Sequence, residues 1–227
     1  MEDKIKKASI IINTICLLFI ILLAPLSFFL FNLENYMGLY RENGVVQHFE
    51  REELINITEN LIGFFKNNQE IKDIDPRGDI PSFTAAEISH LKDVRNLTNI
   101  LMVIFYSSIV FFILFSVLMV GKNLKEFLRR FSLPLIYSSS VVILILLLLV
   151  ILGSLDFWSF FEDFHKVFFP QGNYIFPPSS LIITLFPIGF FYGYFFKLAA
   201  SSGVLSGIAL AAGILSFYYS KGIYGNK

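Results

Sequence analysis

The chain has little charge and almost no cysteine. Only 16% of its 227 residues are Asp, Glu, Lys or Arg, and the formal net charge is zero. Soluble domains usually carry about a quarter charged residues, and a neutral chain has no overall field that would attract nucleic acid. The single cysteine, Cys16, excludes an internal disulfide and a multi-cysteine metal site. We therefore expect neither an ordinary soluble domain nor a nucleic-acid-binding protein.

Short motifs of several enzyme classes are also missing. The sequence contains no G-x-S-x-G elbow, phosphate-binding loop, H-E-x-x-H or C-x-x-C. An acyl-enzyme on serine is therefore not favoured. Its three histidines are His48, His90 and His165, and a site that joined all three around a metal would need long-range convergence that the sequence does not support. We expect no metal and no soluble cofactor.

Long apolar runs are what the chain does contain. Hydrophobic residues make up 55% of it, and several runs exceed the roughly 18 residues that can cross a bilayer. The expected spans are residues 8–31, 97–120, 133–155 and 198–219. The first run is too long for the apolar part of a signal peptide, so we expect it to remain as an anchor. The sequence thus predicts an all-α membrane protein, residues 1–227 forming a single integral membrane domain.

Charge on the segments between the spans predicts their orientation. Residues 32–96 carry seven basic and twelve acidic side chains, and residues 156–179 carry one basic and three acidic. The other flanks are basic, so by the positive-inside rule both termini lie in the cytoplasm and 32–96 and 156–197 lie outside the cell membrane. Pro187 and Lys197 interrupt the last apolar region, and we expect 180–196 to be an outer-leaflet or re-entrant segment. Five crossings would place Lys221 and Lys227 outside, which the rule disfavours.

Two helices are predicted in the first external region. Residues 50–66 have apolar side chains at helical spacing and read as an amphipathic helix. Thr84 and Glu87 form a capping box, which predicts one helix from residue 85 through the second span. Residues 71–82 read as a turn that joins two short extended pieces. The predicted architecture is therefore a four-transmembrane-helix bundle with a small extracytoplasmic α(+β) cap.

Small residues are frequent in the last span. Gly203 and Gly207 form a G-x-x-x-G pair, which allows close helix packing. An intrachain contact is the favoured interpretation, and a dimer contact is the alternative. The oligomeric state does not follow from the sequence.

One candidate site lies just before the second span. Glu87, His90 and Asp93 are spaced by three and so share a helix face. A carboxylate such as Asp93 beside one ring nitrogen would fix the imidazole tautomer and raise the basicity of the other nitrogen. Arg95 projects away from that face and could bind a phosphate headgroup or reach the interface. The alternative is that these residues form a solvated helix end.

The second candidate is His165, just after the third span. Its segment is crowded with aromatic residues, which favour the membrane interface. One interpretation is an aromatic belt with an incidental histidine. In the functional interpretation, a desolvated pocket lowers the pKa of the imidazole and leaves it neutral, suited to proton transfer near the lipid esters.

These residues resemble a known family. The motifs His90-Leu-Lys-Asp93-Val-Arg95 and Phe164-His165-Lys-Val-Phe168-Phe169 are similar to those of the bacterial lipoprotein intramolecular transacylases, as are Leu185-Phe186-Pro187 and Phe190-Phe191. The resemblance covers essentially the whole chain. It implies transfer of the sn-2 acyl chain of a diacylglyceryl-cysteine lipoprotein to the cysteine α-amine, giving a lyso-form lipoprotein. The implied partners are that lipoprotein and membrane lipid.

The resemblance also implies the site residues. His90 and His165 are the expected catalytic pair at the outer leaflet, with Asp93 orienting His90. His90 would be the base toward the amine, and His165 would stabilise the oxyanion or protonate the leaving oxygen, although the roles could be exchanged. Where the family tends to have a tryptophan, the nearest large aromatic residue is Tyr174. Arg95, Glu87 and Tyr174 are the expected substrate contacts.

A second function from a different class is compatible with the same residues. The chain could be a non-catalytic membrane protein that binds lipid or a partner chain through its external cap. The two hypotheses differ in whether the histidine pair is needed for a change in lipoprotein acylation.

Overall fold

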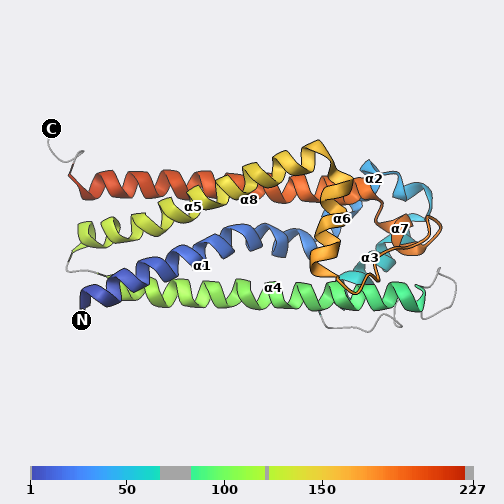
Figure 1. The fold of residues 1–227 in the computed structure, drawn as a ribbon, viewed down its shortest axis with the longest axis horizontal. Helices are drawn as coiled ribbons and strands as arrows, with labels where there is room; N and C mark the ends of the chain where they lie inside the picture. Colours follow the sequence, from blue (N-terminus) through green and yellow to red (C-terminus); the bar gives the residue numbers. More distant parts are fainter. Residues whose placement is uncertain (1, 67–82, 121–122, 223–227) are drawn as a thin grey trace. The chain divides into compact units, whose positions relative to one another are not determined.

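The computed structural model describes residues 2–66, 83–120 and 123–222. In these residues the chain is helical, with no strand (Figure 1). The helices are α1 Glu2–Leu30, α2 Leu33–Glu42, α3 Arg51–Phe65, α4 Ala85–Leu118, α5 Leu124–Leu155, α6 Phe157–Phe168, α7 Leu181–Leu185 and α8 Ile188–Ser220, with a short 3-10 helix, η1, at Val45–Gln47. The extended pieces expected at 71–82 lie outside the described residues.

Four of these helices are long and apolar enough to cross a membrane. They are α1 from Lys4 to Leu30, α4, α5 and α8. Their number confirms the predicted class, an all-α protein with four membrane-length helices. α4 has 34 residues, so at 1.5 Å per residue it rises about 50 Å, well beyond the roughly 30 Å hydrocarbon core. Part of α4 therefore extends out of the apolar layer.

α4 begins at the expected capping box and has no break before Leu118, as the sequence predicts. α8 differs from expectation, because it passes through Lys197 without interruption. The interruption expected at Pro187 is present, between α7 and α8. Lysine is a good helix former, and the Lys197 ammonium lies 3.9 Å from the Glu42 carboxylate, so its charge does not require the helix to end.

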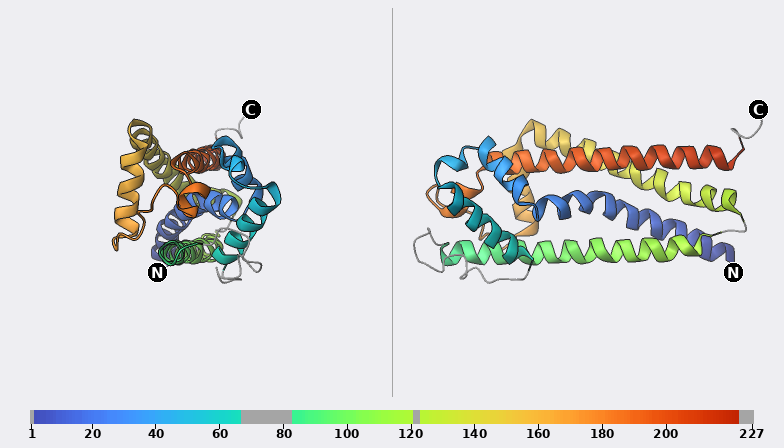
Figure 2. Two further views of the ribbon diagram at one scale, coloured as in Figure 1. Left: turned by 90° about the vertical axis from the view of Figure 1, so that its right-hand side faces the viewer. Right: turned by 180° about the vertical axis from the view of Figure 1, so that it is seen from behind.

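The chain forms two compact units. The first contains Met1–Leu26, Met102–Val150 and Leu198–Lys227. In it, parts of α1, α4, α5 and α8 run side by side (Figure 2). Leu17 and Ile21 of α1 and Val142 of α5 form its small buried apolar cluster. Asn13, fully buried on α1, hydrogen-bonds Ser116 of α4 at 3.0 Å, which ties two of these helices together.

Glycine packing in this unit differs from the prediction. A Cβ at Gly203 or Gly207 would have no atom of the described chain within 4 Å, so the expected intrachain contact at this pair is wrong. Close packing occurs further along α8, at Gly213. A Cβ there would lie 2.9 Å from Leu135 Cβ and 3.1 Å from the Ser132 carbonyl oxygen of α5. The dimer contact through Gly203 and Gly207 stays a prediction.

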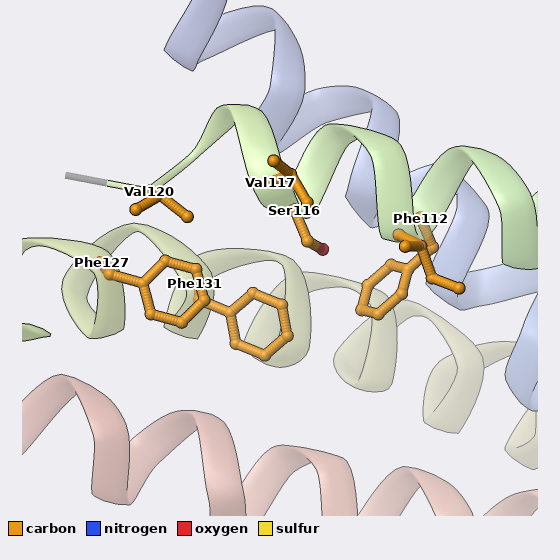
Figure 3. Close-up of a pocket in the computed structure, with 7 residues that line it drawn as sticks. Phe112, Ser116, Val117, Val120, Phe127 and Phe131 are labelled. Carbon is orange, nitrogen blue, oxygen red and sulfur yellow. The ribbon is translucent and has the colours of Figure 1, made fainter.

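The first unit also has an apolar groove between α4 and α5 (Figure 3). Phe112, Phe127 and Phe131 line it, and Ser116 is its one polar residue. Among the described residues, none of those that line this groove is titratable.

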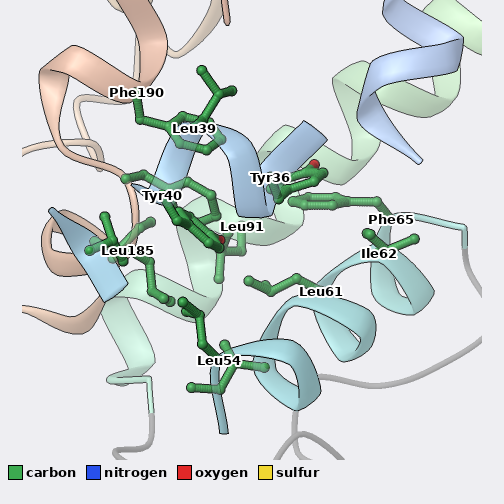
Figure 4. Packing of buried hydrophobic residues seen from close by; sticks show 14 of the residues in the cluster. Tyr36, Leu39, Tyr40, Leu54, Leu61, Ile62, Phe65, Leu91, Leu185 and Phe190 are labelled. Carbon is green, nitrogen blue, oxygen red and sulfur yellow. The ribbon is translucent and has the colours of Figure 1, made fainter. Parts of the chain in front are cut away.

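The second unit contains Ser27–Leu101 and Ile151–Lys197. Its core joins α2, α3, α7, the first part of α8 and the first part of α4 (Figure 4). The apolar face predicted for residues 50–66 is buried in it, since Leu54, Ile57 and Leu61 are at most 1% exposed. Aromatic rings of Tyr36 and Tyr40 pack against Phe186 and Phe190. This core fixes the helix that carries His90.

Candidate active site

His90 lies in the second turn of α4, whose start is firmly held. The Thr84 backbone N–H and hydroxyl both donate to Glu87 Oε2 at 2.7 Å, and the Glu87 N–H donates to Thr84 Oγ1 at 3.3 Å. These are the reciprocal bonds of the predicted capping box. The His90 side chain is 6% exposed and therefore points into the second unit.

His165 lies in the last turn of α6. Asp156 is the N-cap of this helix, and its side chain accepts from the Ser159 N–H at 3.1 Å. His165 is 8% exposed, and its Nδ1 lies 2.8 Å from the Phe161 carbonyl oxygen. A carbonyl only accepts hydrogen bonds, so this contact assigns the proton to Nδ1 and leaves the Nε2 lone pair free in the neutral ring.

The structure brings the two imidazoles together. Their ring centroids are 5.9 Å apart with the planes 28° from parallel, although the residues are far apart in the sequence. Phe169 contacts both rings, at 4.9 Å from His90 and 5.5 Å from His165. Phe176 lies 5.7 Å from His90. Two imidazoles in an aromatic surrounding are thus close enough to share one small substrate group.

Burial changes the acid–base behaviour of His165. Desolvation lowers its pKa below the ordinary value, and the hydrogen bond to the Phe161 carbonyl offsets part of that effect. The imidazole is therefore neutral at pH 7, as the aromatic surroundings predict. A neutral ring with Nε2 free can accept a proton.

Asp93 was expected to orient His90 directly, but its carboxylate accepts hydrogen bonds from two amide side chains instead. Its Oδ2 accepts from Asn173 Nδ2 at 2.6 Å and from Gln171 Nε2 at 2.9 Å. Sequence reasoning missed both amides, which come from the segment after α6. Their signal was weak: Gly172 between them has a φ of 76°, which marks a turn, but nothing in the sequence relates that turn to Asp93.

Glu87, expected to contact substrate, has another position. The side chain is 1% exposed, and besides the capping bonds its Oε1 accepts from the Ile182 N–H of α7 at 2.8 Å. Both carboxylate oxygens of Glu87 therefore already accept hydrogen bonds from the protein. Glu87 instead holds the first turn of α7 against the start of α4.

The other two expected substrate contacts differ in their surroundings. Tyr174 is half-buried with its ring 4.9 Å from that of His165, so it borders the imidazole pair. The Arg95 guanidinium lies over the Phe64 ring of α3, at 4.1 Å from its centroid. His48 is exposed at the end of η1. Within the described ranges, no three His, Cys, Asp or Glu side chains are grouped to hold a metal ion.

Fold and site together define a four-span integral membrane protein with a buried imidazole pair in its second unit. A model of the family named lipoprotein intramolecular transacylase Lit matches residues 11–191, which include every candidate site residue. The chain therefore belongs to the lipoprotein intramolecular transacylase family, and it is an acyltransferase. The resemblance inferred from the histidine motifs is confirmed.

Solved structures share the fold. The membrane integral transacylase Lit from Bacillus cereus matches with a TM-score of 0.68 and 17% identity, over 96% of this chain and 95% of that chain. A variant of the same protein with a histidine replaced by arginine matches with a TM-score of 0.63 and 16% identity, over 96% and 92%. At this identity the likeness shows the fold alone. No curated protein sequence gives a significant match to this chain.

Proposed function

We propose that the chain moves the sn-2 acyl chain of a diacylglyceryl-cysteine lipoprotein to the α-amine of that cysteine. The product is a lyso-form lipoprotein with an N-acyl chain and one remaining glyceryl ester. The observation that carries this proposal is the stacked pair of buried imidazoles, 5.9 Å apart, in a chain of this family.

The reaction needs proton transfer at two atoms. An α-amino group has a pKa of about 7.7–8.0, so near neutral pH it is mostly an ammonium ion and must lose a proton before it attacks. Attack forms a C–N bond and an oxyanion, and the intermediate then breaks the ester C–O bond. The attacking nitrogen loses a second proton, and the leaving glyceryl oxygen gains one.

Two imidazoles match these two transfers. His90 takes the first proton from the ammonium group, and the imidazolium so formed donates a hydrogen bond to the oxyanion. His165 takes the second proton at Nε2 and delivers it to the leaving oxygen. The reaction consumes no co-reactant, because one proton stays in the product alcohol and His90 returns the other to solvent. Donor and acceptor belong to one molecule, so positioning supplies much of the rate.

Residues around the pair suit an amphiphilic substrate. Phe164, Val167 and Phe168 of α6 are apolar and between 41% and 71% exposed, so they offer a surface for acyl chains beside His165. Tyr174, whose ring lies 4.9 Å from that of His165, is the proposed contact for the glyceryl ester. The guanidinium of Arg95, stacked on Phe64, keeps edge N–H groups that can bind phosphate or carboxylate oxygens. We assign Glu87 to holding α7 rather than to substrate.

The site is proposed to lie at the outer leaflet. Each of the four helices has one end next to a chain terminus or next to residues 119–124, and basic residues flank these ends. The segments that carry His90 and His165 connect the opposite helix ends. By the positive-inside rule the termini are cytoplasmic, and the imidazoles face the side on which diacylglyceryl lipoproteins are displayed. The lipoprotein and membrane lipid are the proposed partners.

Expression in a bacterium that lacks its lipoprotein N-acyltransferase tests this function. The parent chain should convert diacyl lipoproteins to the lyso-form, as read by mass spectrometry of the N-terminal lipopeptide. His90→Ala and His165→Ala should each leave the diacyl form. The matched control is His48→Ala, which removes the exposed third histidine and should convert normally. Unchanged diacyl lipoprotein with a well-expressed parent chain would favour the non-catalytic lipid-binding alternative.

A further inference from the structure

The environment of Asp93 determines how Asn173 is oriented. Asp93 Oδ2 accepts two amide hydrogen bonds, from Asn173 Nδ2 at 2.6 Å and Gln171 Nε2 at 2.9 Å. An ionised carboxylate can only accept, so Asn173 must present its NH2 group to Asp93. The amide oxygen of Asn173 is then directed away from Asp93.

Two buried polar atoms beside Asp93 have no hydrogen-bond partner in the described part of the chain. They are Asn173 Oδ1 and His90 Nδ1. Both Asn173 and Asp93 are close enough to His90 to interact with its imidazole. Buried polar atoms without a partner are costly, and one of this pair can be an N–H donor while the other is an acceptor. A hydrogen bond between them would satisfy both atoms.

We propose that Asn173 is a positioning residue that links Asp93 to His90. Its Nδ2 donates to Asp93, and its Oδ1 accepts from the Nδ1–H of His90. This fixes the His90 tautomer and leaves Nε2 as the atom that takes the ammonium proton, a step that rests on the proposed function. Asp93 thereby orients His90 through an amide rather than directly.

In this proposal both imidazoles are held in the same way, by a hydrogen bond from Nδ1–H to an oxygen atom. The Phe161 carbonyl anchors Nδ1–H of His165 at 2.8 Å, and the Asn173 amide oxygen anchors Nδ1–H of His90. The difference is the charge behind the amide. In the described part of the chain, the proposed hydrogen bonds of His90 lead through the amide to the Asp93 carboxylate, whereas the hydrogen bond of His165 ends at the Phe161 carbonyl.

Nitrogen NMR of the imidazoles tests the link without requiring activity. The chain has three histidines, so 15N-labelled full-length protein in detergent gives three ring signals, and that of His90 is assigned by its loss in His90→Ala. We expect His90 as the Nδ1–H tautomer in the parent. Asn173→Ala should shift it toward Nε2–H. Asn173→Asp loses the NH2 donor to Asp93 but keeps an acceptor for His90, so it should retain Nδ1–H.

Gln171→Ala is the matched control. It removes the other amide donor to the same Asp93 oxygen but no group beside His90, so the tautomer should not change. The proposal is overturned if His90 is Nε2–H in the parent, or if Asn173→Ala leaves it Nδ1–H. The two variants at Asn173 are expected to give opposite His90 tautomers. A tautomer change caused only by misfolding at this position would therefore not reproduce both results.

Transacylation kinetics then connect the tautomer to the reaction. Asn173→Ala should lower kcat about tenfold or more with little change in KM, and Gln171→Ala should not. A changed tautomer with unchanged kcat would overturn the positioning role. An inactive parent chain would instead refute the proposed function, while the NMR result would still test the hydrogen bond.

Discussion

His90 and His165 have nearly parallel rings, but the groups that hold them are different. His165 is bonded to a carbonyl on its own helix, four residues earlier. In the proposed link, His90 is held by Asn173, which comes from the segment after α6 and donates a hydrogen bond to Asp93. The orientation of His165 is therefore local to α6, whereas the orientation of His90 requires α4 and that segment to be packed together.

Burial of His165 predicts where it titrates. Because desolvation lowers its pKa, the midpoint should lie below the ordinary value of about 6.5. A histidine NMR titration of the full chain in detergent, with His165→Ala for assignment, measures it. Catalysis that needs neutral His165 should then persist below pH 6.5 and decline only as the pH falls through the lowered pKa. A midpoint at or above 6.5 would contradict the buried site.

The same shift predicts a dependence of stability on pH. Between the lowered pKa and about 6.5, the unfolded chain binds more protons at this residue than the folded chain does. Stability contributed by neutral His165 is therefore fully present above about pH 6.5 and is lost as the pH falls. Thermal unfolding in detergent should show a loss on acidification that is smaller in His165→Ala. Equal losses in the two proteins would argue against this assignment.

Glu87 is expected to contribute to stability rather than to substrate binding. Glu87→Gln keeps the shape but turns an NH2 group toward N–H donors, so it should destabilise the protein by about 1–3 kcal/mol. Thermal unfolding measures the change, with the exposed Glu59→Gln as a control that should stay within about 0.5 kcal/mol of the parent. A stable Glu87→Gln protein with a raised KM would restore the substrate role.

Contacts between residues could be predicted from the sequence where the residues lie close together on one helix. Thr84, Glu87, His90 and Asp93 are linked by helical spacing, so their common location could be read from the sequence. Asn173 could not be found this way, because its bond to Asp93 joins residues 80 positions apart and an uncharged amide has no distinctive pattern. The second bond of Glu87, to α7, was missed for the same reason.

The helices follow local sequence rules more closely than the contacts between them do. The capping box fixed the start of α4, and Pro187 explains why α7 ends before α8 begins. The expectation of a division at Lys197 gave too much weight to a single charge in an apolar run. Glycine contacts could not be predicted from G-x-x-x-G spacing alone, since packing depends on which face of α8 meets α5.

Two glycines of α8 give a matched pair for this contact. Gly213→Ala would place a Cβ 2.9 Å from Leu135 Cβ and 3.1 Å from a backbone oxygen, so overpacking should cost about 1–3 kcal/mol. Gly207→Ala meets open space and should be neutral or stabilising by up to about 1 kcal/mol, because alanine favours a helix.

Thermal unfolding of the monomer in detergent compares the two variants. Equal effects would contradict the packing of α8 on α5. A loss of self-association in Gly207→Ala would instead support the predicted dimer contact through that face.

The described residues form four helices of membrane length, and the second unit carries the imidazole pair. Composition and length predicted the spans, because an apolar helix of this size has few other stable environments. The proposed orientation depends only on the distribution of lysine and arginine. It places the site residues outside.

A pair of reporter fusions tests the orientation. Green fluorescent protein joined after residue 227 should fluoresce, because that reporter folds in the cytoplasm and the C-terminus is proposed to lie there. A periplasmic phosphatase inserted directly after the exposed His48 should be active. The reverse pattern would place the imidazole pair on the cytoplasmic side and contradict the proposed access to lipoproteins.

A crossover experiment tests the intramolecular transfer most directly. Purified full-length protein is given two diacylglyceryl lipopeptides of different peptide mass, one with a deuterated sn-2 acyl chain and one without. Mass spectrometry should find every N-acyl chain on the peptide that first carried it, and none in protein with His90→Ala or His165→Ala. Deuterated chains on the unlabelled peptide, or N-acylation that survives loss of both histidines, would contradict the account.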